Sequence, residues 1–61
     1  MNKIIEDCFK NNKKCVIELS GGSVWKGLIT AIDGEVLLLE TEPKHELYIN
    51  IRFIASVSKS T

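Results

Sequence analysis

Few residues of this 61-residue chain have the types and spacing needed for catalysis. An enzyme needs a nucleophile with its base, a paired acid and base, or a bound metal. The one histidine, His45, stands between Lys44 and Glu46, a setting typical of a solvent-exposed side chain. Ser20 and Ser23 flank two glycines, but this stretch has neither the length of a phosphate-binding loop nor the context of a nucleophile elbow. The sequence therefore predicts a protein that is not an enzyme.

The other reactive side chains have structural explanations. Asp33 lies beside Gly34, where its carboxylate is expected to accept hydrogen bonds from backbone N–H groups of its own turn. Cys8 and Cys15 have neither the spacing of a zinc site nor the number of a disulfide framework, so we expect two buried, reduced thiols and no metal or cofactor. A domain this small buries only roughly 60% of its unfolded surface. Self-association is the remaining source of stability.

The residues best suited to bind a partner are a lysine cluster, one tryptophan and one arginine. Lys10, Lys13 and Lys14 lie at the C-terminal end of a predicted helix. They are expected either to form a solvated helix end or to contact phosphates. Three roles are open for Trp25: it stacks on a base, it lines a subunit contact, or it caps the core beneath the helix. Arg52 contacts a phosphate, forms an intersubunit ion pair or is a solvated turn residue.

The overall charge argues against nucleic acid as a partner. Eight Lys and Arg balance eight Asp and Glu, which gives a formal net charge of zero. A dedicated nucleic-acid binder usually has a basic excess or a basic face.

The sequence shows no secretory leader and no apolar run near the ~18 residues that span a bilayer. We therefore expect a cytoplasmic protein with no membrane partner.

A predicted hairpin organises the elements that position these residues. Two apolar runs, 24–32 and 35–40, flank Asp33-Gly34, which favours a type I′ turn. Gly27 stands where the first run could bend sharply. The second run contains Val36-Leu-Leu-Leu39 without a polar break, which is typical of a strand covered on both sides. A sharply bent strand in so short a chain indicates a small barrel.

The remaining pattern predicts a helix and three further strands. Asn2 can cap a helix that ends near Asn11 or Asn12, with Ile5 and Phe9 on its apolar face. The three further strands are expected at 15–19, 46–51 and 53–58. The expected fold is mainly β, a single domain over residues 1–61. It consists of a short N-terminal helix followed by a small, strongly bent five-stranded open barrel.

The motif V-I-E-L-x-G-G-x-x-x-x-G-x-I-x-x-I-D-x-x-V-L-L-L, from Val16 to Leu39, resembles the first Sm motif. On this motif the chain resembles the Sm-like (LSm) superfamily, and most closely its bacterial Hfq type. The resemblance implies that the fourth and fifth strands pair with those of neighbouring subunits, closing a homo-oligomeric ring of about five to seven copies. The residues assigned to this interface are Tyr48, Ile49, Ile51 and Ile54.

The residues that bind bases in the family are poorly matched. Where Sm and Hfq proteins carry a base-stacking aromatic, this chain has Glu35, and Leu37 replaces the Sm asparagine. The Hfq Tyr-Lys-His tripeptide is missing, although Arg52 resembles the arginine of the second Sm motif, followed here by Phe53 in place of glycine. The usual uridine pocket is therefore not expected.

Two functions from different classes remain open. The first is an Sm-like ring that binds RNA or single-stranded nucleic acid with low affinity. The residues that would bind it are Lys10, Lys13, Lys14, Arg52 and Trp25, where the lysines resemble the basic outer rim of Hfq-like proteins. The alternative is a ring that serves as an assembly or protein-interaction module without nucleic acid. A monomeric SH3-like peptide binder fits less well, because the chain has only four aromatic residues.

Overall fold

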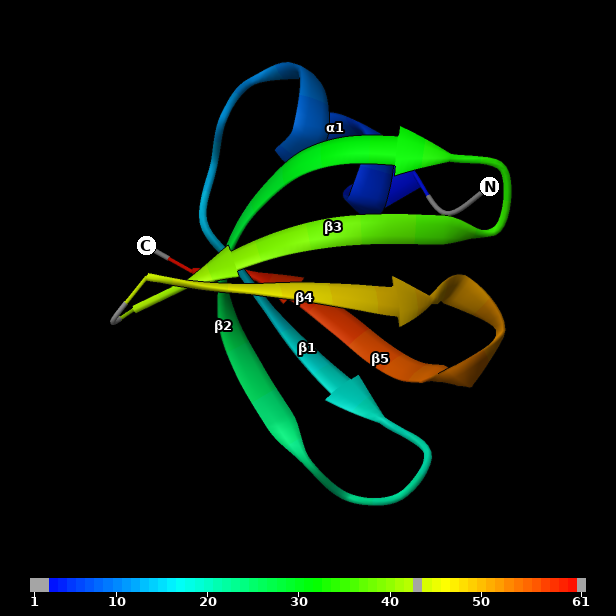
Figure 1. Ribbon diagram of the computed structural model, residues 1–61. Coiled ribbons are helices and arrows are strands. Elements are labelled where there is room, and N and C mark those ends of the chain that lie inside the picture. Colours follow the sequence, from blue (N-terminus) through cyan, green and yellow to red (C-terminus); the bar gives the residue numbers. More distant parts are fainter. Residues whose placement is uncertain (1–2, 43, 61) are drawn as a thin grey trace.

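A helix and a five-stranded antiparallel sheet make up the computed structural model, which describes residues 3–42 and 44–60. The sheet order is β4-β3-β2-β1-β5, so β4 and β5 are its two edges (Figure 1). This arrangement confirms the expected fold class. The elements in chain order are α1 (Lys3–Lys10), β1 (Cys15–Leu19), β2 (Val24–Asp33), β3 (Val36–Thr41), β4 (His45–Asn50), the 3-10 helix η1 (Ile51–Phe53) and β5 (Ile54–Lys59).

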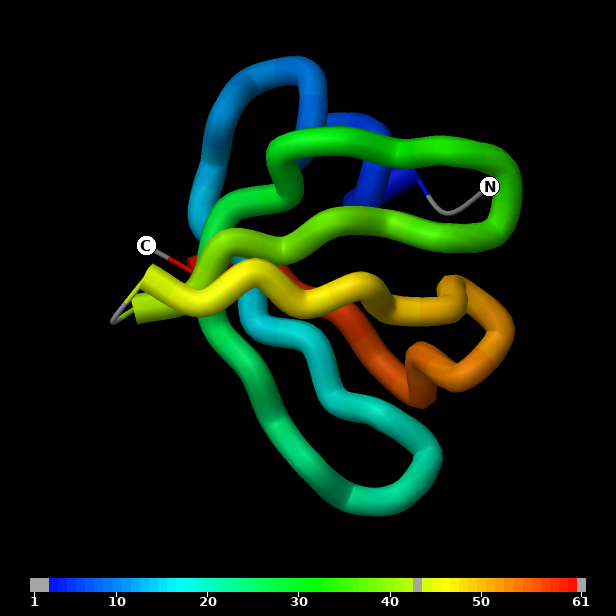
Figure 2. The backbone as a smooth tube through the Cα atoms, viewed as in Figure 1, coloured from blue at the N-terminus to red at the C-terminus, as the bar shows by residue number. Residues whose placement is uncertain are grey.

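Strand β2 bends in the middle and joins two halves of the sheet, as the tube in Figure 2 shows. Its first part pairs with β1 and its second part with β3, and Gly27 belongs to both pairings. A Cβ at Gly27 would overlap the carbonyl oxygen of Glu40 and lie 2.9 Å from the carbonyl carbon. The expected bend at this glycine is confirmed, because only a residue without a side chain lets β3 approach so closely.

The core lies between the concave side of the sheet and α1, which packs against β2 and β5. Both cysteines are free and fully buried, and Phe9 is half-buried against the core, as expected. Burial, with Cys8 beside it, raises the pKa of the Cys15 thiol to about 11, so this thiol stays protonated at neutral pH. The buried apolar residues are Ile5, Cys8, Cys15, Ile17, Ile29, Leu37, Leu39 and Ile49.

The β2–β3 turn differs from the expected one. Asp33 pairs with Val36, so the two central residues are Gly34 and Glu35 rather than Asp33 and Gly34. Only Gly34 has a positive φ, +59°, which matches the φ pattern of a type II′ turn and corrects the expected type I′. The exposed Asp33 carboxylate forms no hydrogen bond within the described residues, so its expected role in the turn is also wrong.

Element ends shift where a local hydrogen bond competes with the periodic pattern. The helix ends at Lys10, because Asn12 adopts a left-handed φ of 51° and the Lys13 N–H donates to the Cys8 carbonyl at 3.0 Å. Strand β4 ends at Asn50, whose side-chain oxygen accepts from the Arg52 N–H at 3.0 Å and begins η1. The expected cap at Asn2 lies outside the described residues.

The expectation that strand β3 is covered on both sides is wrong within the protomer. The concave side of β3 is buried through Leu37 and Leu39, whereas on the convex side Val36 is 38% exposed and Leu38 is half-buried. The aliphatic run indicated cover on both sides, but α1 covers the concave side alone and no described element packs on the convex side. An apolar surface is left open on the convex side.

No helix among the described residues has the length and hydropathy to cross a membrane.

Candidate nucleic-acid interface

The lysine cluster lies at the end of α1 and in the loop that leads to β1. Lys10, Lys13 and Lys14 are all exposed. Lys14 does not stand free, because its Nζ pairs with Oε1 of Glu42 at 2.8 Å and lowers the pKa of that carboxyl. A phosphate at Lys14 would have to displace this carboxylate. Lys10 and Lys13 are therefore the better phosphate ligands on this side.

A second ion pair joins α1 to β5 near the same cluster. Lys59 donates to the carboxylate of Asp7, and this bond lowers the pKa of Asp7 and raises that of Lys59. The positive charge of Lys13 also favours the ionised form of Asp7. The helix side of the protomer thus carries carboxylates among its lysines, and its local charge is more balanced than the run of lysines in the sequence indicates.

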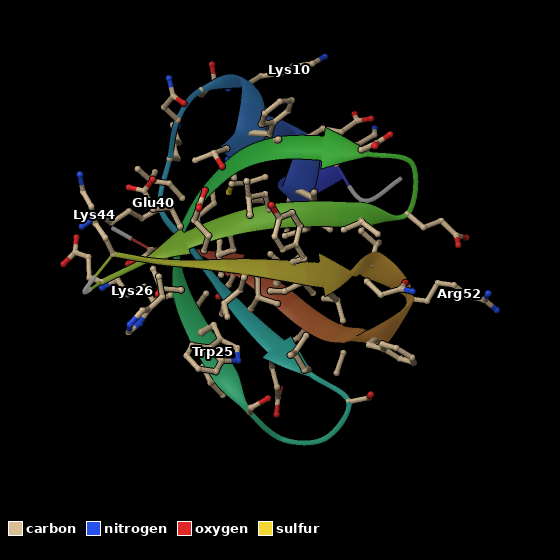
Figure 3. All side chains as sticks on the ribbon, in the orientation of Figure 1. Lys10, Trp25, Lys26, Glu40, Lys44 and Arg52 are labelled. Carbon is tan, nitrogen blue, oxygen red and sulfur yellow. The ribbon has the colours of Figure 1, made fainter. Side chains whose placement is uncertain are left out.

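Trp25 lies on the arm of β2 that pairs with β1, away from α1 (Figures 1 and 3). It stands opposite Ile17, so its side chain is on the concave side of the sheet. It is 38% exposed and does not belong to the buried core, and its neighbour Val24 is 58% exposed. The alternative of a core cap beneath the helix is wrong. An aromatic side chain with one free face suits stacking or a subunit contact.

Arg52 projects from η1 at the right of Figure 3, at the opposite end of the molecule from Lys26 and Lys44 and apart from Lys10. The Ile51 N–H donates to the Glu35 carbonyl at 2.7 Å, which holds η1 against the β2–β3 turn. Arg52 and Glu35 therefore belong to one corner of the protomer. Both are exposed, and within the described residues neither forms an ion pair.

The structure does not bring the five predicted nucleic-acid residues together. Figure 3 shows Lys10, Trp25 and Arg52 in three separate places, on the helix side, on the β1–β2 arm and on the η1 corner. It also shows Lys26 and Lys44 at the end where β3 turns into β4. Sequence reasoning missed these two lysines, although the outward position of Lys26, next to Trp25 on β2, could have indicated one of them. A continuous nucleic-acid surface requires more than one protomer.

A small hollow of about 150 Å³ with charged walls lies beside Lys26, near the end of the molecule where β3 turns into β4. It is lined by Lys14, Lys26, Gly27 and Glu42. The Glu42 carboxylate interacts with both cations, because its pKa is lowered mainly by the bond with Lys14 and slightly by the charge of Lys26. The hollow is thus already neutralised by a carboxylate of the chain itself.

The residues assigned to the subunit interface occupy different environments. Tyr48 on β4 is 75% exposed, while Ile51 and Ile54 are half-buried against the core. Ile49 is only 5% exposed and its side chain belongs to the protomer's own core, so its backbone on β4 is the part placed at the sheet edge. The backbones of β4 and β5 remain at the two sheet edges. Their pairing with neighbouring subunits stays a prediction.

His45 begins β4 and is exposed, and its carbonyl accepts a bond from Thr41 Oγ1 at 3.4 Å. Within ranges 3–42 and 44–60, no group of three or more His, Cys, Asp or Glu side chains could hold a metal ion.

The helix, the strand order and the bent β2 define an Sm-like fold. Within that class the fold is close to the Hfq type. A crystal structure of the pleiotropic translational regulator Hfq superimposes with a TM-score of 0.79 and 23% sequence identity, covering 92% of each chain. At the level of sequence, no protein-family model and no curated protein matches the chain. The likeness at this identity establishes the fold alone.

Proposed function

We propose that residues 1–61 act as one domain that assembles with copies of itself into a ring of about five to seven subunits. The observation that carries this proposal is a pair of unpaired sheet edges, β4 and β5, in a chain with an Hfq-type fold. An exposed edge is a row of free backbone donors and acceptors that favours pairing with another strand. Joining β4 of one copy to β5 of the next satisfies both edges and adds buried surface to a small core.

We further propose that the cytoplasmic ring binds single-stranded RNA or DNA with low affinity. Support comes from the separation of the candidate residues, because a ring repeats each of them around its circumference. Lys10 and Lys13, with Lys14, form a recurring basic rim, while Arg52 supplies a second phosphate contact and Trp25 a stacking surface. Glu35 lies on the Arg52 corner and repels phosphate there. Weak binding at the helix side is the expected result.

The ring is tested by the mass of the assembly in solution. Light scattering at micromolar concentration is expected to give about five to seven times the protomer mass of 6.8 kDa, about 34 to 48 kDa. The mass should not change between about 50 and 500 mM salt, because backbone pairing and apolar contacts are not screened. A monomeric mass at both salt concentrations contradicts the ring.

The nucleic-acid contact is tested by a salt series on labelled single-stranded RNA. Affinity should fall by about tenfold or more between about 50 and 200 mM salt, because phosphate contacts release counterions. The double variant Lys10→Gln/Lys13→Gln should bind more weakly and with a smaller salt slope. Lys3→Gln removes one charge at the opposite end of α1 from Lys10 and should cost less affinity than Lys10→Gln alone. Equal losses in these two single variants would show that the rim is not the site.

The balanced charge favours the second function, a ring that acts as an assembly or protein-interaction module. Net charge is zero, and Glu42 and Asp7 each engage a lysine on or near the helix side. Under this function the ring forms with its full mass, and RNA remains unbound even at about 50 mM salt. The two measurements together therefore separate the functions.

A further inference from the structure

The convex face of β2, β3 and β4 carries an ordered apolar surface. Directly opposite residues in an antiparallel sheet point to the same side. The pairing therefore places Ala31, Leu38 and Tyr48 in one row across the three strands. Val36 lies in the next row on the same face. None of these residues takes part in the buried core.

This surface is hollowed and open. A depression of about 270 Å³ is lined by Ala31, Asp33, Val36, Leu38 and Tyr48. Its volume is at the low end for a small-molecule site, which usually has about 300 to 1,000 Å³ and encloses its ligand. An exposed depression of this size suits one or two side chains of a larger partner. We define these five residues as the convex hollow.

Acidic side chains lie on both sides of the apolar row formed by Ala31, Leu38 and Tyr48. Glu40 and Glu46 form the row on one side of the apolar row, and Asp33 lies on the other side. These three rows of the convex face hold no lysine or arginine, and Asp33, Glu40 and Glu46 form no ion pair within the described residues. The nearest cations on this face, Lys26 and Lys44, belong to the end of the molecule beyond Glu40 (Figure 3). The centre of the convex hollow is thus apolar, and the side chains on either side of that centre are negatively charged.

We propose that the convex hollow is a docking surface for a protein segment that carries lysine or arginine around an aliphatic or aromatic anchor residue. The anchor fills the apolar centre beside Tyr48, and the flanking cations meet Asp33, Glu40 and Glu46. A nucleic acid does not fit this surface, because its phosphates would face three carboxylates. The inference goes beyond the ring and its RNA contact, since it concerns a face that carries no proposed RNA contact. It assigns the side chain of Tyr48, which the family resemblance assigns to the subunit interface, to the partner segment and leaves the β4 backbone to pair with a neighbouring subunit.

The pattern of β3 supports this docking surface independently. Four consecutive aliphatic residues, from Val36 to Leu39, are typical of a strand covered on both sides, yet α1 covers only one. A partner on the convex side would supply the missing cover. Tyrosine is also enriched at the centres of protein interfaces, where its ring packs and its hydroxyl stays near water.

The test uses the intact protein and a fluorescent ten-residue peptide with a central Leu-Trp pair between two runs of four lysines. Binding is measured by anisotropy at about 50 mM salt and located by amide chemical shifts. The expected shifts fall on β3 and β4 around Leu38 and Tyr48. Two control peptides, with Glu for every Lys or with Ser-Ser for Leu-Trp, should bind at least about tenfold more weakly.

Matched variants distinguish this hollow from general attraction between opposite charges. Tyr48→Ala should weaken binding about tenfold, whereas Phe53→Ala, which removes another exposed aromatic side chain, should not. Asp33→Asn/Glu46→Gln should weaken binding about fivefold and Glu6→Gln/Glu18→Gln should not. Equal effects within either pair overturn the proposal. So do shifts at these amides caused by RNA, because RNA would then occupy the face. Shifts at Leu38 on the inner strand β3, caused by raising the protein concentration without peptide, also overturn it, because another copy would then cover the face.

Discussion

Replacing Gly27 by alanine is expected to prevent folding. The added methyl group would overlap the Glu40 carbonyl oxygen, a backbone atom that cannot move away without breaking the pairing of β2 with β3. The cost is about 3 kcal/mol or more. The total free energy of unfolding of a 61-residue domain is only about 3 to 9 kcal/mol. Circular dichroism at 25 °C should show the loss of the sheet signal, and thermal scans should show no cooperative transition.

Gly21 provides the matched control for this prediction. A Cβ at Gly21 meets no atom within 4 Å, and its φ does not lie in the left-handed region. The Gly21→Ala variant should therefore melt within a few degrees of the parent chain, since exposed substitutions usually change stability by less than about 0.5 kcal/mol. If both variants fold equally well, β3 does not approach β2 as closely as described.

Truncating Leu37 is expected to destabilise the protein nearly as strongly. This side chain is fully buried and stands between Ile32 and Ile49 on the neighbouring strands. Leu37→Ala removes apolar contacts and leaves a cavity, with an expected loss of about 2 to 5 kcal/mol. Urea titration followed by Trp25 fluorescence should show a much lower midpoint or an unfolded baseline at all concentrations.

Val36 is the control, because it is the adjacent residue on the same strand and faces the convex side. It is 38% exposed, so Val36→Ala should cost less than about 1 kcal/mol. The contrast between these neighbours measures which side of β3 is covered in solution. Similar losses in both variants would mean that the convex side is also buried, for instance by another protein chain.

Much of the fold could be predicted because its main determinants are local. The two apolar runs around Gly34 predict the β2–β3 hairpin, and a glycine inside the first run predicts the bend at Gly27. The spacing of Ile5, Cys8 and Phe9 predicts a short helix with one apolar face. In each case the residues that determine the turn, the bend or the helix lie inside that element or next to it in the sequence.

The candidate site could be predicted less well because it depends on contacts between distant residues. The Lys14–Glu42 pair joins residues 28 positions apart, and periodicity carries no information about such a contact. The exposure of Trp25 depends on how far α1 extends over the sheet, which no local pattern describes. Likewise, the aliphatic run of β3 indicates cover on both sides, but the sequence does not say whether this chain or another one supplies it.

The pairing of β1 with β5 has a consequence for how the chain folds. Cys15 lies opposite Lys59, which is 44 residues further along the chain. The core therefore cannot close until almost the whole sequence is available, and the ends of a long loop must meet before this pairing contributes any stability. Topologies dominated by such distant pairings fold in milliseconds to seconds rather than microseconds.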